Sequence, residues 1–134
     1  MNIYLHVETS IRELESKILL AVLAASRGHE IIISDIESLE KGIKKGLLAP
    51  GIYHTKSLSP VSHKIARHKM ILKNGNLITS IDEENGLITH GYENTANMRY
   101  SKKTIKDASA IFCWGKEDVQ TLKNIYSKYS SKIY

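Results

Sequence analysis

Short apolar runs alternate with amphipathic segments along the chain, and this alternation indicates an α/β fold. Apolar residues dominate positions 3–7, an amphipathic segment follows, and positions 30–34 contain three consecutive isoleucines. A continuous apolar run is typical of a strand that is buried on both faces of a parallel sheet. The first 35 residues therefore predict a strand, a helix and a second strand that is parallel to the first.

The amphipathic segment after the first strand has the signals of a strong helix. Thr9 or Ser10 can cap its start, and Gly28 follows its end. Its apolar residues recur at helical spacing, and we expect this face to pack on the sheet. The residues of this face are Ile11, Leu14, Ile18, Val22 and Ala25.

The same reasoning extends to the end of the chain. It predicts a helix capped by Asp35, a strand over 52–55, a helix starting at Ser59-Pro60, a strand over 77–81, a long loop over 87–100, a helix over 101–107, a strand over 108–114 and a helix after Gly115. The expected fold is a three-layer, Rossmann-like domain over residues 1–134, with a mostly parallel sheet of five to six strands flanked by helices. Residues 132–134 resemble the start of a further strand, so we expect the first half of a two-domain protein.

Composition limits the class of protein. Hydrophobic residues make up 42% of the 134 residues and charged residues 25%, which is ordinary for a soluble globular domain. Cys113 is the single cysteine, which excludes an internal disulfide and fits a reducing compartment. The N-terminus lacks the basic segment and apolar core of a signal peptide. We therefore expect a cytoplasmic protein.

The net charge of +5 is mild. A positive net charge favours anionic partners such as phosphorylated substrates, or peripheral contact with the anionic inner face of a membrane. Lys64, Arg67 and Lys73 form the basic face of one predicted helix, and such a face is most often only a solvated surface. No nucleic-acid motif is present, so nucleic acid is not an expected partner.

Several kinds of site are excluded by the motifs. The turn after the first strand, at residues 6–10, has no glycine, so a dinucleotide-type phosphate loop is absent there. Neither a P-loop nor a Gly-x-Ser-x-Gly nucleophile motif occurs. His63 and His68 are five residues apart, about 140° around a helix, and cannot share one metal-binding face. We therefore expect no metal site.

Three consecutive carboxylates, Asp82, Glu83 and Glu84, follow the predicted strand 77–81 directly, and Asn85-Gly86 forms a turn after them. Residues just beyond the carboxyl end of a parallel strand line the ligand crevice of α/β sheets. Carboxylates at this place suit a general base or a group that binds hydroxyls. The alternative interpretation is a solvated loop that carries charge for solubility.

A strand order of 3-2-1-4-5, common in doubly wound folds, would place the ends of strands one and four together. Strand one ends at His6 and Glu8, so both polar strand ends would meet at residues 82–84. Arg12 lies one helical turn from Glu8 and can pair with these acids or face a ligand. A salt-bridged network that only holds the loops is the alternative.

Aromatic residues near this edge have two interpretations. Arg99, Tyr92 and Tyr100 can form a lid or a surface on which a sugar stacks, or they can anchor the long loop to the sheet. Trp114 follows the predicted fifth strand, where an aromatic residue is commonly part of the core.

Several short sequence blocks resemble those of bacterial surface carbohydrate biosynthesis proteins, in the same order and over nearly the whole chain. The blocks are Tyr4-Leu5-His6-Val7-Glu8, Arg12-Glu13, Lys17, Ala24-Ala25-Ser26-Arg27-Gly28-His29, Pro50-Gly51-Ile52-Tyr53, Ile81-Asp82-Glu83-Glu84 and Phe112-Cys113-Trp114-Gly115. The chain departs from the family pattern at Asn85, where a glycine is expected.

This family resembles glycosyltransferases of the B fold, which have two facing Rossmann-like domains. The resemblance implies an N-terminal, acceptor-side domain, with a nucleotide sugar bound by a C-terminal domain outside this chain and a glycan or lipid-linked acceptor. An inverting transfer needs a carboxylate base, for which Glu83 or Asp82 is expected, with Glu84 directed elsewhere. Glu8 and Arg12 would orient the acceptor, near His6, Asn85 and Arg99. No metal or cofactor is expected if helix dipoles and basic groups hold the leaving phosphate.

Two alternatives remain from the sequence. One is a different enzyme on the same scaffold, such as a sugar-nucleotide epimerase or a polyol-phosphate transferase. The other is an α/β binding domain without catalysis. A receiver domain is disfavoured, because residues 53–56 offer no acid at the end of the third strand.

Overall fold

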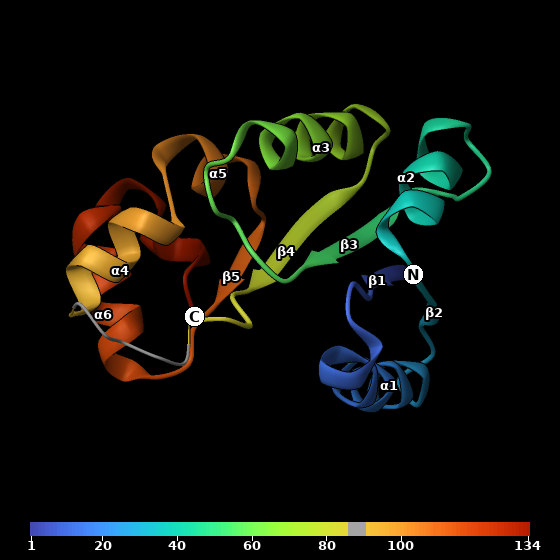
Figure 1. The fold of residues 1–134 in the computed structure, drawn as a ribbon, viewed down its shortest axis with the longest axis horizontal. Coiled ribbons are helices and arrows are strands. Elements are labelled where there is room, and N and C mark those ends of the chain that lie inside the picture. The colour runs from blue at the N-terminus through green and yellow to red at the C-terminus, as the bar shows by residue number, and fades with distance from the viewer. Residues whose placement is uncertain (86–90) are drawn as a thin grey trace. The chain divides into compact units, whose positions relative to one another are not determined.

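The computed structural model describes residues 1–85 and 91–134 and confirms the predicted α/β class. Its parallel strands form one sheet in the order β2-β1-β3-β4-β5 (Figure 1). The strands are β1 (Asn2–His6), β2 (Glu30–Ser34), β3 (Gly51–Thr55), β4 (Leu77–Ile81) and β5 (Ala110–Phe112). The helices are α1 (Ser10–Ala25), α2 (Ile36–Lys44), α3 (Ser62–Lys73), α4 (Tyr92–Arg99), α5 (Lys102–Asp107) and α6 (Lys116–Ile125), followed by the 3-10 helix η1 (Ser127–Lys132).

The predicted strand order 3-2-1-4-5 is wrong, because β3 follows β1 in the sheet and separates it from β4. Alternation of strands and helices fixes parallel direction, but it does not fix the side of β1 on which the third strand is added. In the observed order the winding reverses between β1 and β3, and this is where a doubly wound sheet opens its crevice.

The chain divides into two compact units. Unit 1 comprises residues 1–54 and 70–77, and unit 2 comprises residues 55–69 and 78–134. In unit 1, β1 pairs with β2 on one side and with β3 on the other, so that Tyr4 lies opposite both Ile32 and Tyr53. The connection from β1 to β2 runs toward one edge of the sheet, and the connection from β2 to β3 runs back in the other direction. Because such crossovers are right-handed, α1 and α2 lie on opposite faces of the sheet (Figure 1).

Helix α2 forms as its sequence predicts. The side chain of Asp35 accepts a hydrogen bond from the Ser38 backbone N–H at 2.8 Å, which satisfies a donor that the helix itself leaves free. Leu39 and Ile43 are buried on its inner face. On the outer face, Lys41 lies 3.7 Å from Glu37.

Helix α1 packs with the opposite face from the one predicted. Its buried side chains are Glu13 and Lys17, whereas Ile11 is 97% exposed. Leu14, Ile18 and Val22, which belong to the same predicted inner face, are also exposed. Helical periodicity identifies an apolar face but not the surface that this face contacts. In this helix the charged side chains of Glu13 and Lys17 are the ones buried against the sheet.

In unit 2, β4 pairs with β5, and Ser80 lies opposite Ile111. Ser101 and Thr104 form a reciprocal capping box at the start of α5, as the predicted cap at Ser101 requires. Ile133 forms a single parallel bridge with Ile111, where the sequence suggested the start of a further strand. The core of the unit includes Leu58, Ile78, Ile105, Ile111 and Leu122.

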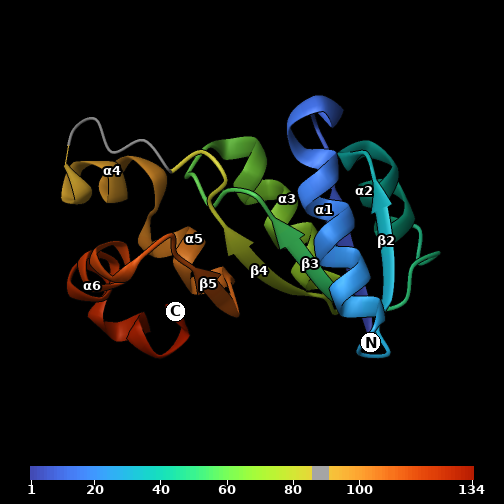
Figure 2. The ribbon, with the colours of Figure 1, turned by 90° about the horizontal axis from the view of Figure 1, so that it is seen from below.

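The predicted loop over 87–100 is wrong for residues 92–99, which form α4. Residues 87–90 of that prediction lie outside the described residues. Helix α4 has no apolar stripe that reveals it in the sequence, and Ala96 is its buried residue. It lies beside α6 (Figure 2), so tertiary packing stabilises a helix that its own pattern does not indicate. Within residues 1–85 and 91–134, no helix has the length and apolar character to cross a membrane.

Gly51 is essential to the pairing of β3 with β1. A Cβ at this position would lie 2.4 Å from the backbone oxygen of Asn2 and 2.9 Å from its Cβ. We expect Gly51→Ala to destabilise the protein by about 1–3 kcal/mol, because the strands must separate to accept the methyl group. Urea unfolding followed by circular dichroism measures this, with Gly115→Ala as the control, since a Cβ there meets nothing within 4 Å. Equal stabilities of the two variants would contradict the prediction.

Candidate functional site

The acidic segment after β4 forms a tight, mostly buried turn in unit 2. Asp82 is 1% exposed, and its side-chain Oδ1 accepts a hydrogen bond from the Glu84 backbone N–H at 3.2 Å. The backbone N–H of Asn85 donates to the Asp82 carbonyl oxygen, also at 3.2 Å. An Asp side chain that binds its own backbone two residues on is a common turn-forming device. The segment is therefore an ordered turn rather than a solvated loop.

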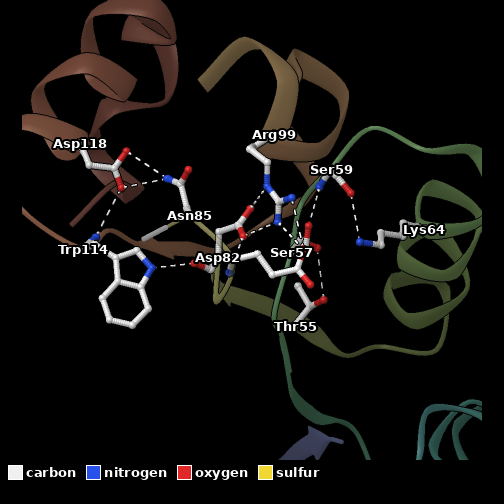
Figure 3. Close-up of polar contacts among 10 residues, drawn as sticks. Thr55, Ser57, Ser59, Lys64, Asp82, Asn85, Arg99, Trp114 and Asp118 are labelled. Atoms are coloured by element: carbon white, nitrogen blue, oxygen red, sulfur yellow. Dashed lines mark hydrogen bonds and ion pairs between the residues drawn. The ribbon is translucent and has the colours of Figure 1, made fainter. Parts of the chain in front are cut away.

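Arg99, the last residue of α4, binds two of the three carboxylates. Its Nε donates to Asp82 Oδ2 at 2.8 Å and its Nη2 to Asp82 Oδ1 at 2.5 Å, a two-point contact (Figure 3). Nη1 and Nη2 each lie 3.3 Å from Glu84 Oε2. The hydrogen bonds to Asp82 raise the pKa of Arg99 above its usual value, so the guanidinium is fixed in its charged form.

The peptide group between Asp82 and Glu83 is held on both sides. Its carbonyl oxygen accepts a hydrogen bond from the indole Nε1–H of Trp114 at 2.6 Å, and its N–H donates to the carbonyl oxygen of Lys56 at 3.1 Å. Glu83 itself has intermediate exposure. The backbone that carries Glu83 is thus fixed by the segments that follow β3 and β5.

The segment 55–58, which begins at the last residue of β3, is buried at every position, although most of its residues are polar. Thr55 Oγ1 donates to the Ser57 carbonyl oxygen at 3.3 Å, and Ser57 Oγ accepts from the Ser59 N–H at 3.2 Å. Lys64 Nζ in turn donates to Ser59 Oγ at 3.0 Å (Figure 3). Hydroxyl groups satisfy the buried backbone of this segment, which holds Lys56 beside the acidic turn.

A second buried carboxylate, Asp118 of α6, closes the other side of the turn. It accepts hydrogen bonds from Asn85 Nδ2 at 3.4 and 3.5 Å and from the Trp114 backbone N–H at 3.4 Å. Burial raises the pKa of Asp118, and the Trp114 and Asn85 donors oppose that shift. Burial, together with the Asp118 charge, raises the pKa of the Cys113 thiol to about 12, which fits the inert thiol that its apolar strand predicts.

The three carboxylates of the turn therefore differ in environment. Both oxygens of Asp82 accept hydrogen bonds and the side chain is buried, so Asp82 serves to position the turn. Glu84 was expected to be directed elsewhere, but it shares Arg99 with Asp82. Glu83 has intermediate exposure, and its backbone is held from both sides by Trp114 and Lys56. This arrangement favours Glu83 over Asp82 as a general base.

The predicted site residues of the first strand lie in unit 1. His6 is buried at the end of β1, with its ring stacked on Tyr53 at a centroid distance of 5.5 Å. The backbone N–H of Glu8 donates to Glu13 Oε2 at 2.8 Å, and Arg12 Nη2 lies 3.7 Å from Glu13 Oε1. Glu13, which the sequence placed on no site, therefore organises this strand end.

The sequence predicted that these two groups of residues meet. His6, Glu8 and Arg12 belong to unit 1, and Asp82, Glu83, Glu84, Asn85 and Arg99 belong to unit 2. The structure brings together the residues within each group, and the meeting of the groups stays a prediction. Its original premise, that strands one and four are neighbours, is the part that the strand order overturns.

Two aromatic interpretations change. Tyr100 is buried in the core of unit 2 and its hydroxyl has a pKa raised by burial, so it is not a surface for stacking. Its carbonyl oxygen accepts a hydrogen bond from the Tyr126 hydroxyl at 3.1 Å. Trp114, by contrast, is 58% exposed and is not the core aromatic residue that its place after a strand suggests.

Sequence reasoning missed Lys56, Asp118 and the buried pair of α1 positions, Glu13 and Lys17. Lys56 had a usable signal, because it directly follows a strand whose carboxyl end faces the same edge as residues 82–84. The sequence placed Asp118 only in the first turn of a helix, where the helix dipole by itself explains an acidic residue.

No group of three or more His, Cys, Asp or Glu side chains that could hold a metal ion is found in residues 1–85 and 91–134. Comparisons of the chain with protein-family models, with curated proteins and with solved structures find no match.

Proposed function

We propose that this chain is the N-terminal, acceptor-side domain of a glycosyltransferase of bacterial surface polysaccharide biosynthesis. A second domain would bind the nucleotide sugar, and a glycan or a lipid-linked sugar would be the acceptor. The observation that carries the proposal is the fixed backbone of Glu83 at the carboxyl end of β4, which suits a carboxylate base. The resemblance of the short sequence blocks supports the choice of reaction.

In the proposed reaction Glu83 takes the proton of the acceptor hydroxyl as the hydroxyl oxygen attacks the anomeric carbon of the donor. The bond from that carbon to the nucleotide phosphate breaks, and the nucleotide leaves with the bonding electrons. Asp82 and Arg99 act as positioning residues, since their two-point contact holds the turn that carries Glu83.

The proposed place of action is the cytoplasm, at the inner face of the membrane. A lipid-linked acceptor is presented there, and the net charge of +5 favours contact with anionic lipid. Lys64 and Arg67 of α3 are the candidates for this contact.

The test is glycosyl transfer by the protein that joins this chain to its donor-binding domain. We expect Glu83→Gln to lower kcat by about 10²–10⁴-fold, because glutamine keeps the shape of the side chain and cannot accept the proton. Glu84→Gln is the matched control: the same exchange, one residue on, should change kcat far less. Product can be measured as surface polysaccharide restored to cells that lack the gene. Transfer by Glu83→Gln at the wild-type rate would refute the proposal.

A further inference from the structure

Trp114 is the sole tryptophan of the chain, and it is exposed beside the acidic turn. Its indole N–H donates to the Asp82 carbonyl oxygen at 2.6 Å, and its backbone N–H donates to Asp118 Oδ2 at 3.4 Å. Figure 3 shows the indole nitrogen directed at Asp82. The ring is therefore tethered at its polar atom and at its backbone, while 58% of the residue remains accessible.

An exposed ring held in this way is prepared for a ligand. The indole N–H is its one polar group, and that group is already satisfied inside the protein, so the surface left to solvent is apolar. A tethered side chain also loses less conformational freedom when a ligand packs on it. Large aromatic surfaces that are both fixed and accessible are typical of recognition sites.

The position of the ring relates it to Glu83. The carbonyl that binds the indole belongs to the peptide group that joins Asp82 to Glu83, so one peptide group separates the tether from the proposed base. A ligand that packs on Trp114 therefore lies close to the backbone that carries Glu83. This geometry suits an acceptor whose hydroxyl must reach the carboxylate.

The charges around the ring select the kind of ligand. Half of the Glu84 side chain is exposed and Glu83 has intermediate exposure, and the single positive charge of Arg99 is shared between Asp82 and Glu84, so the turn keeps a net negative charge. Carboxylates accept hydrogen bonds from hydroxyl groups and repel phosphates. A ligand with one apolar face and a rim of hydroxyl groups fits both the ring and its surroundings, whereas a nucleotide fits only the ring.

We propose that Trp114 is the stacking surface for an uncharged pyranose ring of the acceptor, with the hydroxyl rim of that sugar turned toward the carboxylates of Glu83 and Glu84. This inference rests on the proposed function for the identity of the sugar as acceptor, and it adds the residue that binds it. Binding alone tests it, because the contact is made before any transfer.

The test uses the 134-residue chain and selective excitation of its indole. Methyl β-D-glucopyranoside should change the fluorescence in a saturable way, with a dissociation constant on the order of 1 mM, as its small size allows. Sorbitol offers a similar number of hydroxyl groups without a ring face and should give no saturable change. Absence of a saturable response to the glucoside would overturn the proposal.

Variants locate the binding. Trp114→Ala should weaken binding by roughly tenfold or more, followed by ligand-observed NMR because the indole is lost. Trp114→Phe keeps an aromatic ring without the tether and should give an intermediate affinity, and circular dichroism checks that both variants fold. Tyr134→Ala removes another exposed aromatic ring and is the control that should bind as the wild type does. Equal binding by Trp114→Ala and the wild type would refute the assignment.

The two proposals fail in distinguishable ways. Glu83→Gln keeps the ring and loses one carboxylate that faces the sugar, so it should weaken binding of the glucoside far less than Trp114→Ala does while it abolishes the base. Binding through Trp114 together with transfer that does not depend on Glu83 would overturn the catalytic proposal and leave the sugar site. Transfer that depends on Glu83, with KM for the acceptor unchanged in Trp114→Ala, would overturn the stacking proposal alone.

Discussion

Arg99→Ala should destabilise the protein by about 3 kcal/mol. The variant leaves Asp82 buried at 1% exposure without the cation that contacts both of its oxygens, and a buried charge without its partner typically costs about 3–5 kcal/mol. The lower end of that range applies because about a quarter of the Arg99 side chain is exposed. Urea unfolding at neutral pH, followed by Trp114 fluorescence, measures the loss close to the affected turn.

Arg12→Ala is the matched control for this change. Arg12 is also an arginine beside a carboxylate, but its side chain is 61% exposed and its contact with Glu13 is 3.7 Å long. We expect it to cost under about 1 kcal/mol. The double variant Arg99→Ala with Asp82→Asn should recover part of the stability, since it removes the unpaired charge. A similar cost for the two single arginine variants would show that the Asp82 contact does not hold the turn.

The second large effect is a loss of stability in acid through His54 and His68. Burial lowers the pKa of each imidazole to about 4, with positive neighbours adding to the shift, Lys17 for His54 and Arg67 and Lys64 for His68. The unfolded chain binds these protons near pH 6.5, so each histidine's share of stability is complete above that pH and is lost as the pH falls toward 4. By linkage the loss is about 3 kcal/mol for each residue.

Imidazole NMR titration measures the two pKa values directly, and urea unfolding between pH 7 and pH 4 measures their effect on stability. His68→Leu should flatten the acid dependence by about 3 kcal/mol, because the leucine has no proton to bind. His63→Leu removes a solvent-exposed histidine of the same helix and is the control that should keep the loss of stability caused by His68. Titration of His68 near its ordinary pKa of about 6.5 would contradict the prediction.

The local structure of this protein could be predicted where the residues themselves determine it. The isoleucine run identifies β2 as a strand, and Asp35 and Ser101 cap the helices that they were expected to cap. The expected burial of β2 on both faces is wrong, because β2 is an edge strand and Ile32 is 40% exposed. The position of β3 beside β1 depends instead on the close approach at Gly51, which has no signature in a strand pattern. Helix α4 and the packed face of α1 likewise depend on neighbours distant in the sequence.

The candidate site divides in the same way. An acidic turn after β4 follows from the order of apolar and polar residues, and the structure has it there. The contact of Arg99 with Asp82 spans 17 residues, and the tether of Trp114 to the same turn spans 32. Such contacts require the fold. They also distinguish Asp82 from Glu83, which the sequence alone left as equal candidates.

The inward charges of α1 have a consequence for the handling of the protein. Helix α1 contacts its sheet through Glu13, Lys17 and small residues, so the exposed leucines on its outer face contribute little to the stability of the fold. Polar substitutions at those outer positions should therefore reduce self-association of the protein at high concentration and should change the free energy of unfolding little.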